Sequence, residues 1–212
     1  MSEQIKHHRF HDQEWVDSYI GSITDRRPER VEMFDHIAGL IKRLPFPRPH
    51  VLELAAGSGM LAETLLEKLG DITYESIDYS APMVTRARES LSRYDDRVIL
   101  HQADLNSSDW EDVLSQEIHV VVSNMAIHDL GNENNVAAIY HKVRDRLNAG
   151  GILINADLVL PEEEDIEDDK GKLKTSRHLE LLKDLGLVEV QCSLSFGYYA
   201  CIIGTKPDHD QI

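Results

Sequence analysis

A glycine-containing turn between a predicted strand and a predicted helix carries the clearest chemical signal in the sequence. The stretch VLELAAGSGMLA reads as strand, turn and helix, and Gly57 and Gly59 would let the backbone approach a ligand closely while N–H groups at the helix start point toward it. The turn also fits the G-x-G-x-x-A pattern of dinucleotide-binding proteins, and Asp78 follows at the distance expected of a ribose-binding acid. A nicotinamide-dependent enzyme is one interpretation, and a turn that only packs the helix onto its strand is another.

The carboxyl group of Glu53, at the end of the same predicted strand, separates these interpretations. A pyrophosphate held by the turn would be repelled by this carboxylate. A ligand with an ammonium or a sulfonium group would instead be attracted to it in a partly desolvated cleft. S-adenosylmethionine carries both positive groups together with ribose and adenine, so the pattern favours this cofactor. A glutamate at the end of a buried strand can also cap a helix or pair with an arginine, and that structural alternative stays open.

With these features the sequence resembles the class I S-adenosylmethionine-dependent methyltransferases, over nearly its whole length. VLELAAGSG is similar to the first motif of that family, with Ala55 where a first glycine is more usual. The resemblance implies that Glu53 contacts the methionine end of the cofactor, directly or through water. It also assigns Ala55, Gly57, Ser58 and Gly59 to the cofactor site, where the glycines admit the methionine part. The product of the reaction would be S-adenosyl-L-homocysteine.

Two further strand ends continue the resemblance. The stretch IDYSAPM is similar to a D-x-S-x-x-M motif, in which Asp78 would accept bonds from both ribose hydroxyls while Tyr79 and Met83 flank the adenine. QADL matches a G-D-hydrophobic position, where Asp104 would accept from the adenine amino group and the backbone N–H of Leu105 would reach a ring nitrogen. The structural alternatives are that Met83 is a core residue of its helix and that Asp104 caps a turn.

The segment VVSNMAIHDL, in which the fourth predicted strand of the core ends, resembles the S-N-x-x-x-H-x-L segment of the family. Asn124 and Met125 would lie beside the amino end and the methyl group of the cofactor. His128 is a candidate catalytic base because an imidazole titrates near neutral pH, although a histidine satisfied by backbone contacts is the structural alternative. The Asn-Pro-Pro-Tyr or Asp-Pro-Pro-Tyr motif of relatives that methylate amino groups of nucleic acids and protein glutamines is absent. Tyr19, from the N-terminal helices, would reach the cofactor carboxylate.

Apolar residues at helical spacing predict amphipathic helices near the N-terminus, and short apolar runs then alternate with further helices. Predicted helices cover residues 12–20, 31–44, 60–69, 81–94, 133–147 and 173–185. Predicted strands cover residues 50–54, 72–77, 98–103, 118–123, 152–160, 187–195 and 198–205.

This alternation predicts an α/β fold: a doubly wound, mostly parallel, Rossmann-like sheet with helices on both faces and a C-terminal antiparallel hairpin. The resemblance implies seven strands in the order 3-2-1-4-5-7-6. We expect one methyltransferase domain over residues 1–212. Its predicted parts are an N-terminal helical lid region (1–44), a proline-rich linker (45–49), a catalytic core (50–206) and an acidic loop (161–172).

The charge of the sequence restricts its partners. With 38 acidic and 22 basic residues the formal charge is −16, which argues against a broad basic face for nucleic acid. Seven acids occupy residues 161–169, so the excess is partly local. This acidic run could steer a cationic acceptor, but a solvated loop is the simpler interpretation.

Other features predict the setting of the protein. No stretch is long and apolar enough for a membrane span or a secretory signal, so we expect a cytoplasmic protein without a membrane partner. Cys192 and Cys201 are too few for a disulfide framework. His7, His8 and His11 lack a paired ligand motif, and no metal site is predicted.

The leading hypothesis is a methyltransferase that moves the methyl group from the sulfonium of S-adenosylmethionine to a nucleophile on a small molecule by in-line displacement. A noncatalytic, cofactor-binding partner protein is the alternative from another class. A protein or tRNA acceptor also stays open, the latter only if Arg26, Arg27 and Arg30 form a local basic patch. An NAD(P) oxidoreductase is disfavoured, because no Tyr-x-x-x-Lys dyad occurs and no second catalytic domain remains. The sequence does not predict the oligomeric state.

Overall fold

The computed structural model describes residues 9–114, 117–163 and 171–208. Its α-helices are α2 (Gln13–Arg26), α3 (Glu29–Lys42), α4 (Met60–Leu69), α5 (Ala81–Ser90), α6 (Glu133–Arg146) and α7 (Thr175–Asp184). Its strands are β1 (His50–Leu54), β2 (Thr73–Asp78), β3 (Val98–Gln102), β4 (Ile118–Asn124), β5 (Leu147–Leu158), β6 (Val188–Ser195) and β7 (Tyr199–Thr205). Short 3-10 helices are η1 (Ser92–Tyr94), η2 (Trp110–Val113) and η3 (Ile127–Asp129).

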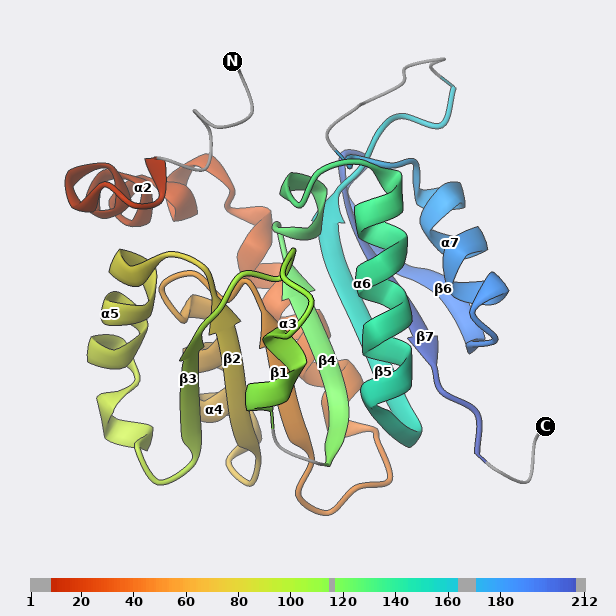
Figure 1. Cartoon of the computed structure of the whole chain (residues 1–212), viewed down its shortest axis with the longest axis horizontal. Helices are drawn as coiled ribbons and strands as arrows, with labels where there is room; N and C mark the ends of the chain where they lie inside the picture. Colours follow the sequence, from red (N-terminus) through yellow and green to blue (C-terminus); the bar gives the residue numbers. More distant parts are fainter. Residues whose placement is uncertain (1–8, 115–116, 164–170, 209–212) are drawn as a thin grey trace.

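The seven strands form one sheet in the order β3-β2-β1-β4-β5-β7-β6, which confirms the predicted topology (Figure 1). β1 pairs in parallel with β2 and with β4, whereas β7 is antiparallel to both β5 and β6. The chain runs to β2 and β3 on one side of β1 and to β4 and β5 on the other. Ligands of open α/β sheets bind at such a switch point, outside the carboxyl ends of the strands. The order of the strands therefore brings the ends of β1, β2 and β4 to one site.

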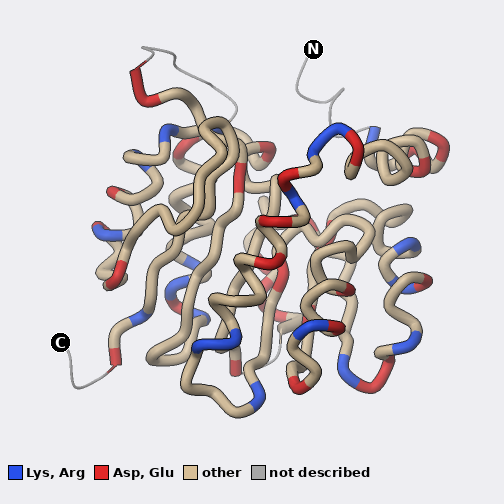
Figure 2. The backbone as a smooth tube through the Cα atoms, turned by 180° about the vertical axis from the view of Figure 1, so that it is seen from behind, with Lys and Arg blue, Asp and Glu red and all other residues tan. Residues whose placement is uncertain are grey.

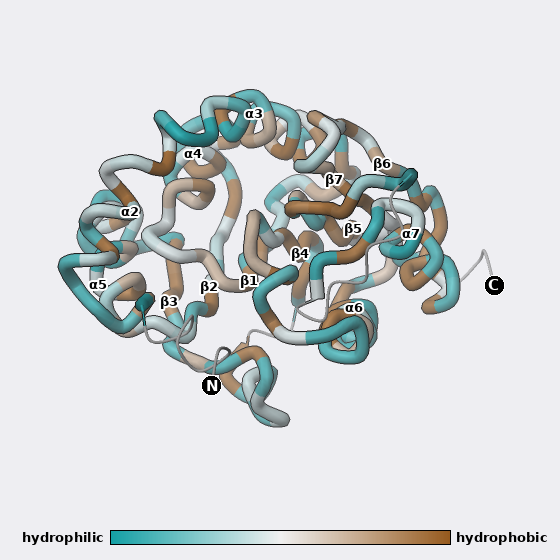
Figure 3. The backbone as a smooth tube through the Cα atoms, turned by 90° about the horizontal axis from the view of Figure 1, so that it is seen from above, coloured by the Kyte–Doolittle hydropathy of each residue, from teal (hydrophilic) through white to brown (hydrophobic). Residues whose placement is uncertain are grey.

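Helices cover both faces of the sheet, as the sequence predicts (Figure 3). Apolar side chains of α3, α4 and α5 pack into one core, and those of α6 and α7 pack with η2 into the other. The central strands β1, β4 and β7 have almost continuous burial, whereas the edge strands β3 and β6 do not. In β4, for example, Val120, Val121 and Val122 are all at most 1% exposed. The apolar runs of the sequence thus form the two-sided core that a mostly parallel sheet requires.

Three predicted boundaries are wrong by more than two residues. The helix predicted to stop at Gly21 continues to Arg26, because nothing crowds Gly21 and its neighbours keep the helical hydrogen bonds. The helix predicted over 81–94 ends at Ser90 and is followed by the separate turn η1. β5 begins at Leu147 rather than at residue 152, since a register shift beside Ile118 allows the Ala-Gly-Gly stretch to join the strand.

The C-terminal hairpin holds both cysteines, which are free thiols. Cys192 is paired with Ile202 and not with Cys201, because the register between β6 and β7 shifts between Cys192 and Leu194. The two thiols consequently contribute to opposite cores. A cross-strand disulfide, considered from the sequence alone, does not fit this register.

Charged residues of both signs are interspersed along the fold (Figure 2). Most of the acidic loop, residues 164–170, lies outside the described residues, as do His7 and His8. Among the residues that are described, no helix combines the length and the apolar composition needed to cross a bilayer.

Candidate cofactor site

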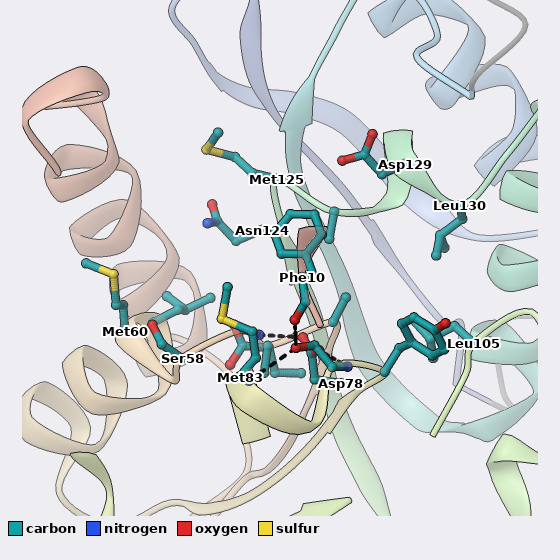
Figure 4. Close-up of a pocket in the computed structure, with 18 of the residues that line it drawn as sticks. Phe10, Ser58, Met60, Asp78, Met83, Leu105, Asn124, Met125, Asp129 and Leu130 are labelled. Carbon is teal, nitrogen blue, oxygen red and sulfur yellow. Dashed lines mark hydrogen bonds between the residues drawn. The ribbon is translucent and has the colours of Figure 1, made fainter. Parts of the chain in front are cut away.

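A cavity of about 500 Å³ lies at the carboxyl ends of β1, β2 and β4, and residues of the N-terminal helices also line it (Figure 4). It lies within the range of about 300–1,000 Å³ typical of small-molecule sites. Twelve predicted cofactor residues line it: Tyr19, Glu53, Ala55, Gly57, Ser58, Asp78, Tyr79, Met83, Asp104, Leu105, Asn124 and Met125. The thirteenth, Gly59, lies just behind the wall as the N-cap of α4. The strand order thus brings together residues that are far apart in the sequence.

Three residues of the glycine turn adopt backbone conformations that are unfavourable for residues with a side chain. Ala55, Gly57 and Gly59 all have positive φ angles, of 51°, 58° and 81°. A Cβ atom at Gly59 would lie 3.0 Å from Leu91 Cδ1, so a side chain there is disfavoured both by conformation and by space. Ala55 adopts the same left-handed region with a methyl group, which costs roughly 1–2 kcal/mol for an L-residue.

Asp78 joins the glycine turn to the loop after β2. Its Oδ2 accepts from the Gly57 N–H at 2.7 Å and its Oδ1 accepts from the Ser80 N–H at 2.8 Å (Figure 4). Burial raises the pKa of Asp78, although the two N–H bonds favour its ionised form. Each carboxylate oxygen has a second lone pair, so Asp78 can hold the turn and still accept from two ligand hydroxyls.

Glu53 is deeply buried at the end of β1, with only 2% of its surface exposed. Its Oε2 accepts a hydrogen bond of 2.8 Å from the hydroxyl of Tyr74, which is fully buried in β2. Burial raises the pKa of Glu53 to about 8, and the charge of Asp78 adds to this effect, while the Tyr74 bond and Arg30 oppose it. A cation bound at this wall of the cavity would favour the ionised carboxylate.

Arg30, on α3, is a cavity residue that the sequence-based reasoning did not assign to the cofactor. Its Nη1 lies 3.9 Å from Met60 Sδ, and its guanidinium lies over the ring of Phe34 at 5.1 Å. The Nε atom is buried and has no hydrogen-bond partner within the described part of the chain. A signal was present in the sequence: Arg30 precedes Phe34 and Ile37 at helical spacing, which places a charge on the buried stripe of α3.

The opposite end of the cavity is formed by the segment after β4. Asn124 Oδ1 accepts a hydrogen bond from the hydroxyl of Tyr199, which fixes the orientation of the amide. Met125 has a φ angle of 52° and donates its N–H to Ala156 O at 2.8 Å. Asp104 Oδ1 accepts the N–H of Asn106 at 2.9 Å, so this carboxylate also caps its turn.

His128 is not among the residues that line the cavity. Its Nδ1 lies 2.6 Å from Asp157 Oδ1, and its backbone N–H donates to Asp157 Oδ2 at 2.8 Å. The next residue, Asp129, does line the cavity, and His128 Nε2 lies 3.5 Å from its Oδ2. The predicted base His128 is therefore next to a cavity residue but does not itself line the cavity.

The N-terminal wall holds aromatic side chains. Tyr19 stacks on Trp15 with a centroid distance of 5.2 Å, and Phe10 packs edge-on against both rings. The Phe10 carbonyl accepts from the Ser80 hydroxyl, and Figure 4 shows the Phe10 ring in the middle of the cavity. His11 packs against Tyr79 at 4.4 Å. No sequence motif had indicated Phe10.

Comparison with known proteins identifies a related family and related sequences. Residues 52–153 match the family model described as a methyltransferase domain. A carboxy-S-adenosyl-L-methionine synthase of Aeromonas salmonicida is 26% identical over 184 residues, which cover 86% of this chain and 71% of the relative. A reducing polyketide synthase, Preu2 of Preussia isomera, is 27% identical over 115 residues, which cover 53% of this chain and 5% of that much longer protein.

Solved structures of other proteins have a similar fold. An O-methyltransferase family protein from Burkholderia thailandensis superposes with a TM-score of 0.76 at 19% identity, covering 95% of this chain and 62% of that one. At this identity the likeness concerns the fold. The methyltransferase family model matches from within β1 into β5, and the sheet has the strand order expected of that family, so residues 52–153 form a methyltransferase domain of the class I S-adenosylmethionine-dependent type.

Proposed function

We propose that this protein transfers a methyl group from S-adenosylmethionine to a nucleophile on a small molecule. The observation that carries the proposal is the arrangement of charge around one cavity: Glu53 and Arg30 approach its methionine end, and Asp78 and Asp104 lie where ribose and adenine would bind. A ligand with an ammonium, a carboxylate, two vicinal hydroxyls and an amino group would satisfy these four side chains together.

The residues present fit such a cofactor. The buried Nε of Arg30, without a partner among the described residues, would gain a carboxylate acceptor. Glu53, protonated at neutral pH in the free protein because of its raised pKa, would ionise beside an ammonium group. Asp78 and Met83 would hold the ribose and one face of the adenine. When bound, S-adenosylmethionine supplies a methyl group already activated by the sulfonium.

The role of the protein is then alignment and exclusion of water. Phe10 and Tyr19 cover the cavity from the N-terminal side, and the short segment after β4 closes the other. A volume of about 500 Å³ favours a small acceptor over a macromolecular one. His128 does not line the cavity, so the proposed transfer does not require it as a base in contact with the acceptor.

The test is calorimetry of the full chain with S-adenosylhomocysteine, followed by turnover of S-adenosylmethionine with a labelled methyl group and a broad set of small molecules. We expect saturable binding and transfer of label to at least one small molecule. Absence of binding would overturn the proposal. Binding without any transfer would favour the alternative of a noncatalytic cofactor-binding partner, and transfer only to protein or tRNA would correct the acceptor class.

A further inference from the structure

The end of the cavity beside Met125 contains a carboxylate that the cofactor does not require. Glu53, Asp78 and Asp104 are assigned above to the ammonium, ribose and adenine, whereas Asp129 lines the cavity from η3. In Figure 4, Asp129 and Met125 lie on the same side of the cavity, away from Asp78. Asp129 is therefore placed to meet the acceptor. This step rests on the proposed function.

A buried pair of side chains, His128 and Asp157, lies next to the Asp129 carboxylate, which is itself 40% exposed. Asp157 is fully buried in β5, and both of its oxygens are engaged by His128, through Nδ1 at 2.6 Å and through the backbone N–H at 2.8 Å. The Leu158 N–H adds a third bond to Asp157 at 2.8 Å. His128 thus has a fixed ring orientation, with Nε2 directed to Asp129 at 3.5 Å.

The charge state of His128 follows from its contacts. Burial alone would lower the pKa of His128, but the charge and the hydrogen bond of Asp157, with a smaller contribution from Asp129, raise it above its ordinary value. The charge of Lys172 opposes this rise of the pKa. A protonated imidazole would donate to Asp157 through Nδ1 and present its positive charge to Asp129 from Nε2. The positive imidazolium of His128 would therefore lie beside the Asp129 carboxylate that lines the cavity.

We infer that Asp129 receives the methyl acceptor, and that the acceptor is a small molecule whose nucleophilic nitrogen or oxygen carries a hydrogen: an amine or a hydroxyl compound, and not a carboxylate. His128 and Asp157 are positioning residues for Asp129. An ionised carboxylate accepts a hydrogen bond from N–H or O–H, and it repels an anionic acceptor in a cavity that already contains three other carboxyl groups.

Asp129 takes up the proton that the methyl transfer releases. The lone pair of the acceptor nitrogen or oxygen forms a bond to the methyl carbon while the carbon–sulfur bond breaks and leaves its electron pair on sulfur. The hydrogen of the acceptor passes as a proton to the Asp129 carboxylate, from which water can take it after the products leave. No other reactant is needed.

The test measures binding of three matched probes, benzyl alcohol, benzylamine and benzoate, to the complex of the full chain with S-adenosylhomocysteine. We expect wild type to bind the alcohol or the amine about tenfold or more tightly than benzoate, as expected for a hydrogen bond to a charged group. Asp129→Asn should bring this ratio within about threefold. Asp112→Asn, at an exposed position in η2, is the matched control and should leave the ratio unchanged.

The outcomes separate this inference from the proposed function. If S-adenosylhomocysteine does not bind, the proposed function fails. If it binds with the same affinity in wild type and Asp129→Asn, but the wild type binds benzoate equally well or binds none of the probes, the role of Asp129 is overturned. His128→Gln should lower kcat for an amine or hydroxyl acceptor about tenfold with little change in KM, whereas a purely structural role would lower stability without this split.

Discussion

The two sides of the cavity are built in different ways. On the sheet side, Glu53, Asp78 and Asn124 stand at the ends of β1, β2 and β4, and each is held by a hydrogen bond from buried or backbone groups. On the N-terminal side, Phe10, Tyr19 and Arg30 come from segments outside the sheet and are held mainly by ring contacts.

The difference concerns how much of each wall exists before a ligand binds. The sheet side is fixed by β-pairing and by two-sided burial, so its polar groups are preorganised. The N-terminal side depends on a helix pair and on the contact of Phe10 with Ser80, which a ligand can displace or reinforce. We therefore expect substitutions on the sheet side to affect both affinity and the folded state, and those on the N-terminal side to affect affinity alone.

The largest effect is expected for Asp78→Ala. This change removes the acceptor for two ribose hydroxyls and also the partner of the Gly57 and Ser80 N–H groups. We expect calorimetry to show S-adenosylhomocysteine binding weakened by about a hundredfold or more, since hydrogen bonds to charged groups contribute about 1.5–3 kcal/mol each. Asp95→Ala, at an exposed site, is the control. Wild-type affinity in a folded Asp78→Ala protein would show that the sheet side does not bind the ribose.

Glu53→Gln tests the cost of a buried carboxyl group. The pKa of Glu53 is about 8 in the folded protein against an ordinary 4.5, so at pH values between these two the unfolded chain ionises while the folded chain stays protonated. The free energy of unfolding of wild type should therefore fall, relative to the glutamine variant, as the pH rises from 5 to 8. We expect this relative change in the free energy of unfolding to total about 2 kcal/mol over the three pH units. This total lies below the limit for one group, which is about 1.36 kcal/mol for each pH unit.

Denaturant titrations without ligand at pH 5, 6.5 and 8 measure this change. Glu117→Gln, at an exposed position, is the control and should run parallel to wild type. The glutamine variant should also bind S-adenosylhomocysteine more weakly, because it cannot offer a charge to the ammonium group. Parallel curves for Glu53→Gln and wild type would mean that Glu53 is ionised in the free protein, and that the sheet side is less desolvated than its burial indicates.

The same contrast explains what the sequence could predict. The strand order followed from the family resemblance. The sheet-side residues followed from local patterns, because Gly57, Asp78 and Asn124 each occupy a fixed position at the end of an apolar run. Arg30 and Phe10 belong to no such pattern, and their arrival in the cavity depends on how α2 and α3 pack over the sheet. The position of His128 was missed for another reason: its partner Asp157 lies in β5, and no local pattern joins the two.

Arg30→Met probes the N-terminal side. The change keeps an apolar stem on α3 but removes the charge that would meet the cofactor carboxylate. We expect about tenfold weaker binding of S-adenosylhomocysteine in calorimetry, at the low end for a charge-assisted bond, with thermal stability unchanged. 5′-Methylthioadenosine, which lacks the amino-acid portion, should bind both proteins equally.

Arg26→Met is the matched control, since Arg26 lies over the Tyr19 ring at 5.5 Å without lining the cavity. If Arg30→Met lost equal affinity for S-adenosylhomocysteine and for 5′-methylthioadenosine, Arg30 would act through the shape of the cavity wall and not through its charge. A loss of stability as large as the loss of affinity would remove the distinction between the two sides.

The smallest effect is expected for Ala55→Gly, which tests whether the turn is already in its binding conformation. Ala55 has a φ of 51°, where an L-residue is strained by roughly 1–2 kcal/mol in the folded protein. Glycine removes this strain, but its greater freedom in the unfolded chain lowers the stability by about 0.5–1 kcal/mol. The variant should gain up to about 1 kcal/mol in denaturant titration, with affinity for S-adenosylhomocysteine within about twofold. Ala56→Gly, at the next position and without a positive φ, should lose stability. If both substitutions destabilise equally, the methyl group of Ala55 matters through packing, and the turn forms only when the cofactor binds.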